Sequence, residues 1–285
     1  MFCKVWSLGR AGEGNNVIIR HSSDPMEGLA PEDTFVAYDD LEDELGEATV
    51  QSNMADMLCP RRPHLLLIRA KCQPEARDAL LGAATARALK LARSEENAAA
   101  RIYTECPPED QELMGILTTL GYEDDDGLLR MRRVIQKGPV VKPFPAGCTL
   151  VRDHLDDEDE QRFFLERYNA MFSRNRDAAW LNGIRAKPDF LRLLVVSPDG
   201  LAGELLIWTE GGQGVVGIVQ TTPSWQRKGV GSYLVDCARS HWARLGVREA
   251  YFDVWTRLTG AVRLAATSGF RPDEMLMRYP GIDIG

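Results

Sequence analysis

The sequence contains no long apolar run, no paired cysteine motif and no histidine cluster. None of its 285 residues belongs to a stretch apolar enough to cross a membrane as a helix, and Met1–Trp6 does not begin a secretory signal. The cysteines lack Cys-x-x-Cys spacing and the four histidines are isolated, which argues against a metal site. We therefore expect a cytoplasmic protein with reduced thiols and no bound metal. The six cysteines are Cys3, Cys59, Cys72, Cys106, Cys148 and Cys237.

An excess of positive charge is also missing. There are 34 lysines and arginines against 42 aspartates and glutamates, so the formal net charge is −8. A nucleic-acid-binding surface would need basic residues gathered over an extended face, and we expect no such partner. Acidic residues gather in runs at 39–47, 124–126 and 153–160. Such runs are ordinarily solvated loops or helix starts, although they could also attract a cationic acceptor.

Several nucleotide and hydrolase motifs are absent or out of context. Neither Gly-x-x-x-x-Gly-Lys-Ser/Thr nor Gly-x-Ser-x-Gly occurs. Gly212–Gly217 matches the dinucleotide pattern Gly-x-Gly-x-x-Gly, but these glycines open an apolar extended run, whereas the pattern requires glycines that open a helix. We interpret them as a hairpin turn and expect no nicotinamide cofactor.

The most informative segment that is present is Gln226–Ser232, which reads Gln-Arg-Lys-Gly-Val-Gly-Ser. It follows Val215–Thr222, a β-branched run that stops at Pro223, and it precedes an apolar stripe at helical spacing. The two glycines therefore fall at a helix N-terminus, where free N–H groups and the helix dipole favour an anion. A tight turn with solvated cations is the alternative. The stripe consists of Leu234, Ala238, Trp242 and Leu245, with Gly246 as the expected C-terminal cap.

With its surroundings, this segment resembles the cofactor loop of the GNAT (Gcn5-related) N-acetyltransferase superfamily. The family pattern Gln/Arg-x-x-Gly-x-Gly/Ala is present as Gln226, Gly229 and Gly231, and the resemblance runs from about Cys148 to Tyr279. It implies an α/β (α+β) fold with a mixed, mostly antiparallel sheet flanked by helices. It also implies that acetyl-CoA is the acyl donor, with its pyrophosphate on the loop amides and its pantetheine arm along the preceding strand. The implied binding residues are Val219, Thr221, Gln226, Arg227, Lys228, Gly229, Val230, Gly231 and Ser232.

The first half of the chain resembles the second. Pro74–Gly82 aligns with Pro223–Gly231 without a gap, but Leu80 replaces the first glycine and Asp78 replaces a cation. A leucine Cβ would crowd a phosphate and an aspartate would repel it. We predict a degenerate GNAT-like domain at 1–137, a linker rich in proline and glycine at 138–147, and an acetyl-CoA-binding GNAT domain at 148–285. A coincidental strand-helix-strand similarity is the alternative.

The catalytic residues are less evident. Asp253, on a predicted strand at Glu249–Trp255, occupies a position that carries an acidic base in some family members, and Glu204 is the second candidate. Either could equally be a structural carboxylate, Asp253 for example in a pair with Arg257. The family tyrosine that protonates the departing sulfur is replaced by Ala265. Tyr233, Tyr251 and Thr256 are the available substitutes.

These features predict an N-acyltransferase that moves an acetyl group from acetyl-CoA to an amine of a small molecule or peptide. Gln226, Gly229 and Gly231 are intact, so donor binding is the firmer part of this prediction. Because Ala265 has no proton to give, the alternative is a non-catalytic protein that binds or senses acyl-CoA.

Overall fold

The computed structural model describes residues 16–24, 28–56, 58–94, 99–138, 142–172 and 174–285. It divides the chain into two compact units, one formed by Met1–Gly127 with Met277–Gly285 and the other by Leu128–Leu276. Cys3, Met1–Trp6 and residues 139–141 of the predicted linker lie outside the described residues. The other five cysteines are free thiols. In the described part of the chain, no helix has the length and apolarity to span a membrane.

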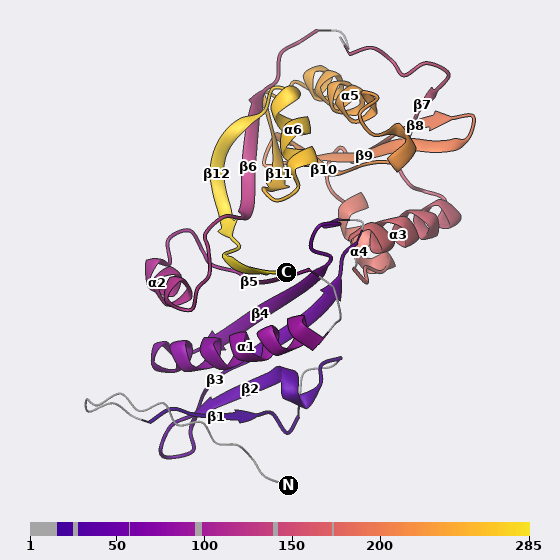
Figure 1. The fold of residues 1–285 in the computed structure, drawn as a ribbon. Helices are drawn as coiled ribbons and strands as arrows, with labels where there is room; N and C mark the ends of the chain where they lie inside the picture. Colours follow the sequence, from indigo (N-terminus) through magenta and orange to yellow (C-terminus); the bar gives the residue numbers. More distant parts are fainter. Residues whose placement is uncertain (1–15, 25–27, 57, 95–98, 139–141, 173) are drawn as a thin grey trace. The chain divides into compact units, whose positions relative to one another are not determined.

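The first unit is a six-stranded sheet with a long helix on one face (Figure 1). The parallel pair β4–β5 is joined through the helix α1, and the other neighbours are antiparallel. Helix α1 buries Leu80, Leu81 and Ala84 against Leu66 and Ile68. In sheet order, the strands are β1 (Ile18–His21), β2 (Thr34–Tyr38), β3 (Glu44–Met54), β4 (His64–Cys72), β5 (Ala100–Thr104) and β13 (Gly281–Ile284); the helices are the 3-10 turn η1 (Pro31–Asp33), α1 (Pro74–Ser94) and α2 (Gln111–Thr119).

The second unit is a seven-stranded sheet with α5 and α6 on one face and α3 and α4 on the other. Its parallel pair is β10–β11, joined through α5. In sheet order, the strands are β12 (Arg271–Arg278), β6 (Gly127–Val134), β11 (Glu249–Trp255), β10 (Gln213–Thr221), β9 (Gly200–Glu210), β8 (Leu191–Ser197) and β7 (Thr149–Asp153). The helices are α3 (Glu158–Phe172), α4 (Ala178–Arg185), the 3-10 turn η2 (Pro223–Trp225), α5 (Val230–Leu245) and α6 (Thr259–Thr267). The expected mixed sheets flanked by helices are confirmed.

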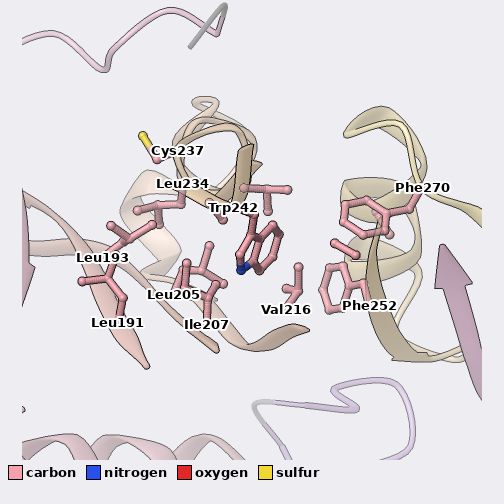
Figure 2. Close-up of a cluster of buried hydrophobic side chains, with 14 of the residues drawn as sticks. Leu191, Leu193, Leu205, Ile207, Val216, Leu234, Cys237, Trp242, Phe252 and Phe270 are labelled. Carbon is pink, nitrogen blue, oxygen red and sulfur yellow. The ribbon is translucent and has the colours of Figure 1, made fainter. Parts of the chain in front are cut away.

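The main core of the second unit lies between the sheet and α5 (Figure 2). Trp242 stands at its centre and is fully buried, as are Leu234 and Ala238 of the same predicted stripe. Gly246 caps the helix with a left-handed φ of 80°, as predicted. The fourth stripe residue, Leu245, was predicted wrongly, because its side chain is 47% exposed. It lies in the last turn, beyond the edge of the packed surface.

Each sheet contains a strand from the part of the chain that was predicted to form the other domain. Strand β6, which precedes the predicted linker, lies between β11 and β12 in the second sheet, whereas the C-terminal strand β13 pairs with β5 in the first. The compact units therefore divide the chain at positions other than 137 and 148. Residues 128–137 belong to the second unit, and residues 277–285 belong to the first.

The two segments aligned in the sequence have different conformations. Residues 223–229 form the turn η2 and an exposed loop, and α5 begins only at Val230. In the first unit, by contrast, α1 already begins at Pro74 and runs through the whole aligned segment, with Leu80 fully buried. The first unit thus has a helix where the second has a glycine loop, a larger difference than the crowding and repulsion expected from Leu80 and Asp78.

Candidate cofactor site

The two parallel strands of the second unit separate partway along their length. Only Gly214, Val215 and Val216 of β10 pair with β11, opposite Ala250, Tyr251 and Phe252. Beyond that point, residues 218–221 pair with β9 alone, while residues 253–255 pair with β6 alone. Among the described strands, none occupies the space between them. The backbone N–H and C=O groups of residues 218–221 on this edge of β10 therefore have no described strand as a partner, and a chain carrying amide groups could pair with them; we call this unpaired edge the opening.

A β-bulge at Gly217 accompanies this separation. The pairing of β10 with β9 shifts between Val216 and Ile218, so one residue of β10 is left over. A Cβ at Gly217 would lie 1.9 Å from Cζ3 of Trp208, which means that the indole occupies the space a side chain would need. Strand pair β3–β4 of the first unit keeps an unbroken register, and β4 stays paired with β5 as far as β5 extends. Between these two strand pairs, the bulge is thus found in the second unit, although β4 of the first unit also continues past the end of β5 at residues 69–72.

The predicted phosphate loop lies at the N-terminus of α5. Gly229 is the N-cap residue, with φ 85°, and has no side chain to cap the helix. The first N–H groups of a helix have no partner within it, so the amides of Val230, Gly231 and Ser232 can bind an anion. A Cβ at Gly229 would meet no atom within 4 Å, whereas a Cβ at Gly231 would lie 3.3 Å from Leu264. Gly229 is therefore favoured by its left-handed backbone conformation, whereas a side chain at Gly231 would be in tight contact with Leu264 of α6.

Positive charge surrounds this helix end. Arg227 is exposed and has a left-handed φ of 60°, which is unfavourable for a residue with a side chain. Lys228 is exposed too, with its Nζ 4.9 Å from the centre of the Trp225 ring. Gln226 donates a side-chain hydrogen bond of 3.4 Å to the carbonyl oxygen of Thr221, which ties the loop to the end of β10. Strained backbone next to free amides is a common property of binding loops.

Asp253 is the first residue of β11 beyond the paired region. Its alternation is as predicted: Phe252 and Val254 are buried in the core against α5, and Asp253 is on the opposite face. Both of its carboxylate oxygens accept hydrogen bonds from Arg130 of β6, at 2.8 and 2.7 Å. The side chains are 28% and 24% exposed. The structural partner is thus Arg130, directly across the strand pair, rather than the Arg257 considered from the sequence.

Glu204, the second candidate base, is completely buried in a charged cluster. Arg192 donates to it at 3.0 Å from Nε, Arg167 of α3 at 3.1 Å, and Gln220 of β10 through its side-chain amide. Arg192 is itself 1% exposed and also binds Glu160 at 3.0 Å. Hydrogen bonds from two guanidinium groups and an amide fix this carboxylate in place. This arrangement suits a structural role for Glu204.

In the described part of the chain, the three hydroxyl residues considered as proton donors in place of Ala265 lie in different surroundings. Ala265 is fully buried in α6. Tyr251 donates its hydroxyl to Glu210 at 3.0 Å and pairs with Val215, before the strands separate. Burial raises the pKa of Tyr251 to about 12 and that of Tyr233 to about 12. Thr256 follows β11 directly.

The sequence did not reveal the residues that bind the two candidate carboxylates, which lie far from them along the chain. Arg130, Arg192 and Gln220 were not predicted, because nothing local distinguishes a paired arginine from a solvated one. Gly217 could have been found, since a glycine inside a β-branched strand is a known signal for a bulge. It was instead assigned to the hairpin turn, which the structure confines to Gly211 and Gly212.

Solved structures share this architecture. A GCN5-related N-acetyltransferase from Sphaerobacter thermophilus superposes with a TM-score of 0.50 and 20% identity, over 90% of this chain and 82% of its own. A protein of unknown function from Enterococcus faecalis V583, described as a probable N-acyltransferase, superposes with a TM-score of 0.54 and 16% identity, over 86% and 61%. No family model and no curated protein matches the sequence. The GNAT fold predicted from the sequence resemblance is confirmed.

Proposed function

We propose that the second unit binds acetyl-CoA and transfers its acetyl group to the amine of a small molecule or peptide. The observation that carries this proposal is the position of the Gly229 loop. It follows directly on the part of β10 that has left β11, so free helix amides and a free strand edge adjoin each other. An acyl-CoA has a pyrophosphate and an arm with amide groups, and it needs both features.

The residues present fit that donor. The amides of Val230, Gly231 and Ser232, with Arg227 and Lys228 beside them, would hold the pyrophosphate. Val219 and Thr221 lie on the free part of β10, whose backbone would pair with the pantetheine amides. In the first unit α1 covers the corresponding segment, so we assign donor binding to the second unit alone.

Bound acetyl-CoA supplies a thioester whose C–S bond breaks as the amine nitrogen bonds to the carbonyl carbon. Asp253 is our candidate base, because it lies at the start of the opening and is partly exposed. Since Arg130 engages both carboxylate oxygens, we propose that Asp253 takes the amine proton through water. With Ala265 in place of a donor, the sulfur would leave as a thiolate and be protonated by solvent. A thiol is acidic enough to leave without an acid catalyst.

A non-catalytic acyl-CoA-binding protein is the second candidate. Two observations favour it: Arg130 already engages both carboxylate oxygens of Asp253, and Ala265 is buried and has no proton to donate. Both functions place the donor in the same loop and differ only in turnover. The free thiols of the described cysteines suit the cytoplasmic location expected for either.

Donor binding is tested by two substitutions at one position. Asparagine and aspartate both tolerate a left-handed φ, so Gly229→Asn and Gly229→Asp keep the loop at similar strain and differ mainly in charge. A charge 4 Å from the pyrophosphate is worth about 1 to 4 kcal/mol. We predict by calorimetry that Gly229→Asn lowers acetyl-CoA affinity about tenfold at most, and that Gly229→Asp lowers it a further 5- to 1,000-fold, roughly, because of the added charge.

Gly212→Asp is the matched control. Gly212 also has a positive φ, 78°, with no atom within 4 Å of an added Cβ, but it lies in the hairpin turn. This variant should bind acetyl-CoA like the wild type. Equal affinity of the two Gly229 variants would refute the loop assignment. Release of CoA with a panel of amines separates an enzyme from a sensor, and no turnover across the panel would favour the sensor.

A further inference from the structure

A small cavity with cationic walls lies beside the first turn of α5. It has a volume of about 230 Å³ and is lined by three parts of the second unit: the start of α5, the end of α6, and β6 with the segment that follows it. Ser232, one of the predicted loop residues, forms part of its wall, so the cavity adjoins the helix end described above. The lining residues are Arg133, Lys142, Ser232, Asp236, Thr267, Ser268 and Gly269.

Arg133 of β6 brings an uncompensated positive charge to this cavity. Its guanidinium donates a hydrogen bond to the carbonyl oxygen of Ser268 at the end of α6. It also lies close to the next residue, because a Cβ added to Gly269 would be 3.4 Å from Cζ of Arg133. Among the described residues, no carboxylate lies within ion-pair distance of it. Burial first, and then the charge of Arg239, lower the pKa of Arg133, although Asp236 opposes this. A guanidinium has five N–H donors, so most of them remain available.

The other walls complete a site for an anion. Ser268 is only 6% exposed, and its hydroxyl has no hydrogen-bond partner in the described part of the chain. Lys142 adds a second cation. The one acidic wall residue, Asp236, is already engaged: Arg239 donates to it at 2.6 Å, and the backbone N–H of Lys142 donates to it at 3.2 Å. With the Asp236–Arg239 pair neutral, the cavity carries the charges of Arg133 and Lys142.

We infer that this cavity binds a phosphate monoester, and that the group is the 3′-phosphate at the nucleotide end of the donor. The inference rests on the proposed function, since only a CoA held at the Gly229 loop would bring that phosphate past Ser232. The volume of the cavity suits one group of a larger ligand rather than a whole small molecule. Sites for whole small molecules measure about 300–1,000 Å³, and this cavity is smaller. Arg133 would thereby be a specificity residue that distinguishes CoA from its dephosphorylated form.

The test compares CoA with 3′-dephospho-CoA by calorimetry, on the full chain. A hydrogen bond to a charged group is worth about 10- to 100-fold in affinity, so we expect the wild type to prefer CoA by roughly that factor. The glutamine of Arg133→Gln can still donate to the carbonyl oxygen of Ser268. This variant should bind CoA more weakly and 3′-dephospho-CoA as before, so that the two affinities become about equal. Lys142→Gln should reduce the preference in part.

Arg132→Gln is the matched control. Arg132 is the preceding residue of β6, on the opposite face, where it pairs with Asp273 at 2.8 Å. This variant should keep the full preference for CoA. An unchanged preference in Arg133→Gln, or equal binding of both ligands by the wild type, would overturn the inference while leaving donor binding intact.

A third titration uses inorganic phosphate. If phosphate alone binds in an Arg133-dependent way and the wild type does not prefer CoA, the cavity takes a free phosphate and the donor assignment is wrong. If neither form of CoA binds, the proposed function itself fails, and with it the route by which the 3′-phosphate reaches the cavity.

Discussion

Asp253 and Glu204 are both carboxylates of the second sheet, yet their surroundings differ. Asp253 is 28% exposed and paired with a single arginine beside the opening. Glu204 has no exposed surface and binds two arginines, one of which is 1% exposed. Removing one partner from a buried pair leaves a charge without compensation, whereas a partly exposed pair loses little. We therefore expect substitution of Glu204 to affect mainly the stability of the protein, and substitution of Asp253 to affect mainly the proposed activity.

We predict that Glu204→Gln lowers the free energy of unfolding by about 1.5–3 kcal/mol, because Arg192 and Arg167 lose a charged acceptor with no exposed surface, although Arg192 keeps Glu160 at 3.0 Å. Asp253→Asn should lower it by less than about 1 kcal/mol. If the protein is an enzyme, Asp253→Asn should lower kcat about 100-fold with KM nearly unchanged. Urea unfolding and steady-state kinetics give both quantities. A large loss of kcat in folded Glu204→Gln, with none in Asp253→Asn, would reverse the assignment.

At the scale of elements, local signals and distant ones differ in what a sequence can reveal. The Gln226–Ser232 loop was predictable, because glycines between a strand and a helix are a local pattern. The Arg130–Asp253 pair was not, since its members are 123 positions apart and belong to strands whose neighbourhood depends on the whole sheet. Pro74–Gly82 is a third case, because its alignment with Pro223–Gly231 did not predict its conformation. With Leu80 in place of the first glycine, the aligned segment forms the start of α1, and Leu80 packs into the first core.

The separation of β10 from β11 depends on one glycine and one indole. Because Trp208 fills the space beside Gly217, we predict that Gly217→Ala destabilises the protein by about 1–3 kcal/mol and also weakens acetyl-CoA binding. Trp208→Phe shortens the side chain at the contact, so the double variant should recover part of both losses. A double-mutant cycle of urea unfolding measures the coupling.

Additive effects of the two substitutions on the free energy of unfolding would contradict this account. If Gly217→Ala costs the same in the presence of Trp208→Phe, the indole does not enforce the bulge. Gly212→Ala is a useful comparison, since Gly212 has a positive φ and no neighbour within 4 Å. It should destabilise through backbone strain alone and leave acetyl-CoA affinity unchanged.

At the scale of the whole molecule, the exchanged strands mean that neither sheet is complete within one continuous half of the sequence. Strand β13 is held in the first sheet by Arg101, which is 1% exposed. Arg101 donates to Asp283 of β13 at 2.9 Å, to Asp125 at 2.5 Å, and to the carbonyl oxygen of Tyr279 at 3.1 Å. Together with Arg62, whose Nε lies 3.3 Å from Asp283, and with the backbone pairing of β5 and β13, this buried guanidinium fixes the C-terminal segment of the chain to a sheet made largely from the N-terminal segment.

We predict that Asp283→Asn loosens this attachment and nothing else. Losing one charged partner of a buried arginine is worth about 1.5–3 kcal/mol, so backbone amides of β5 and β13 should exchange hydrogen roughly 10- to 100-fold faster. Peptides from α5 and β11 should keep their protection against hydrogen exchange, because both elements belong to the second unit. The affinity for acetyl-CoA should be unchanged, because the proposed donor site lies in the same unit. Faster exchange in all peptides by one common factor would instead mean that the two units unfold as a single cooperative structure. In that case the exchanged strands join the stability of the donor-binding unit to that of the unit without a cofactor loop.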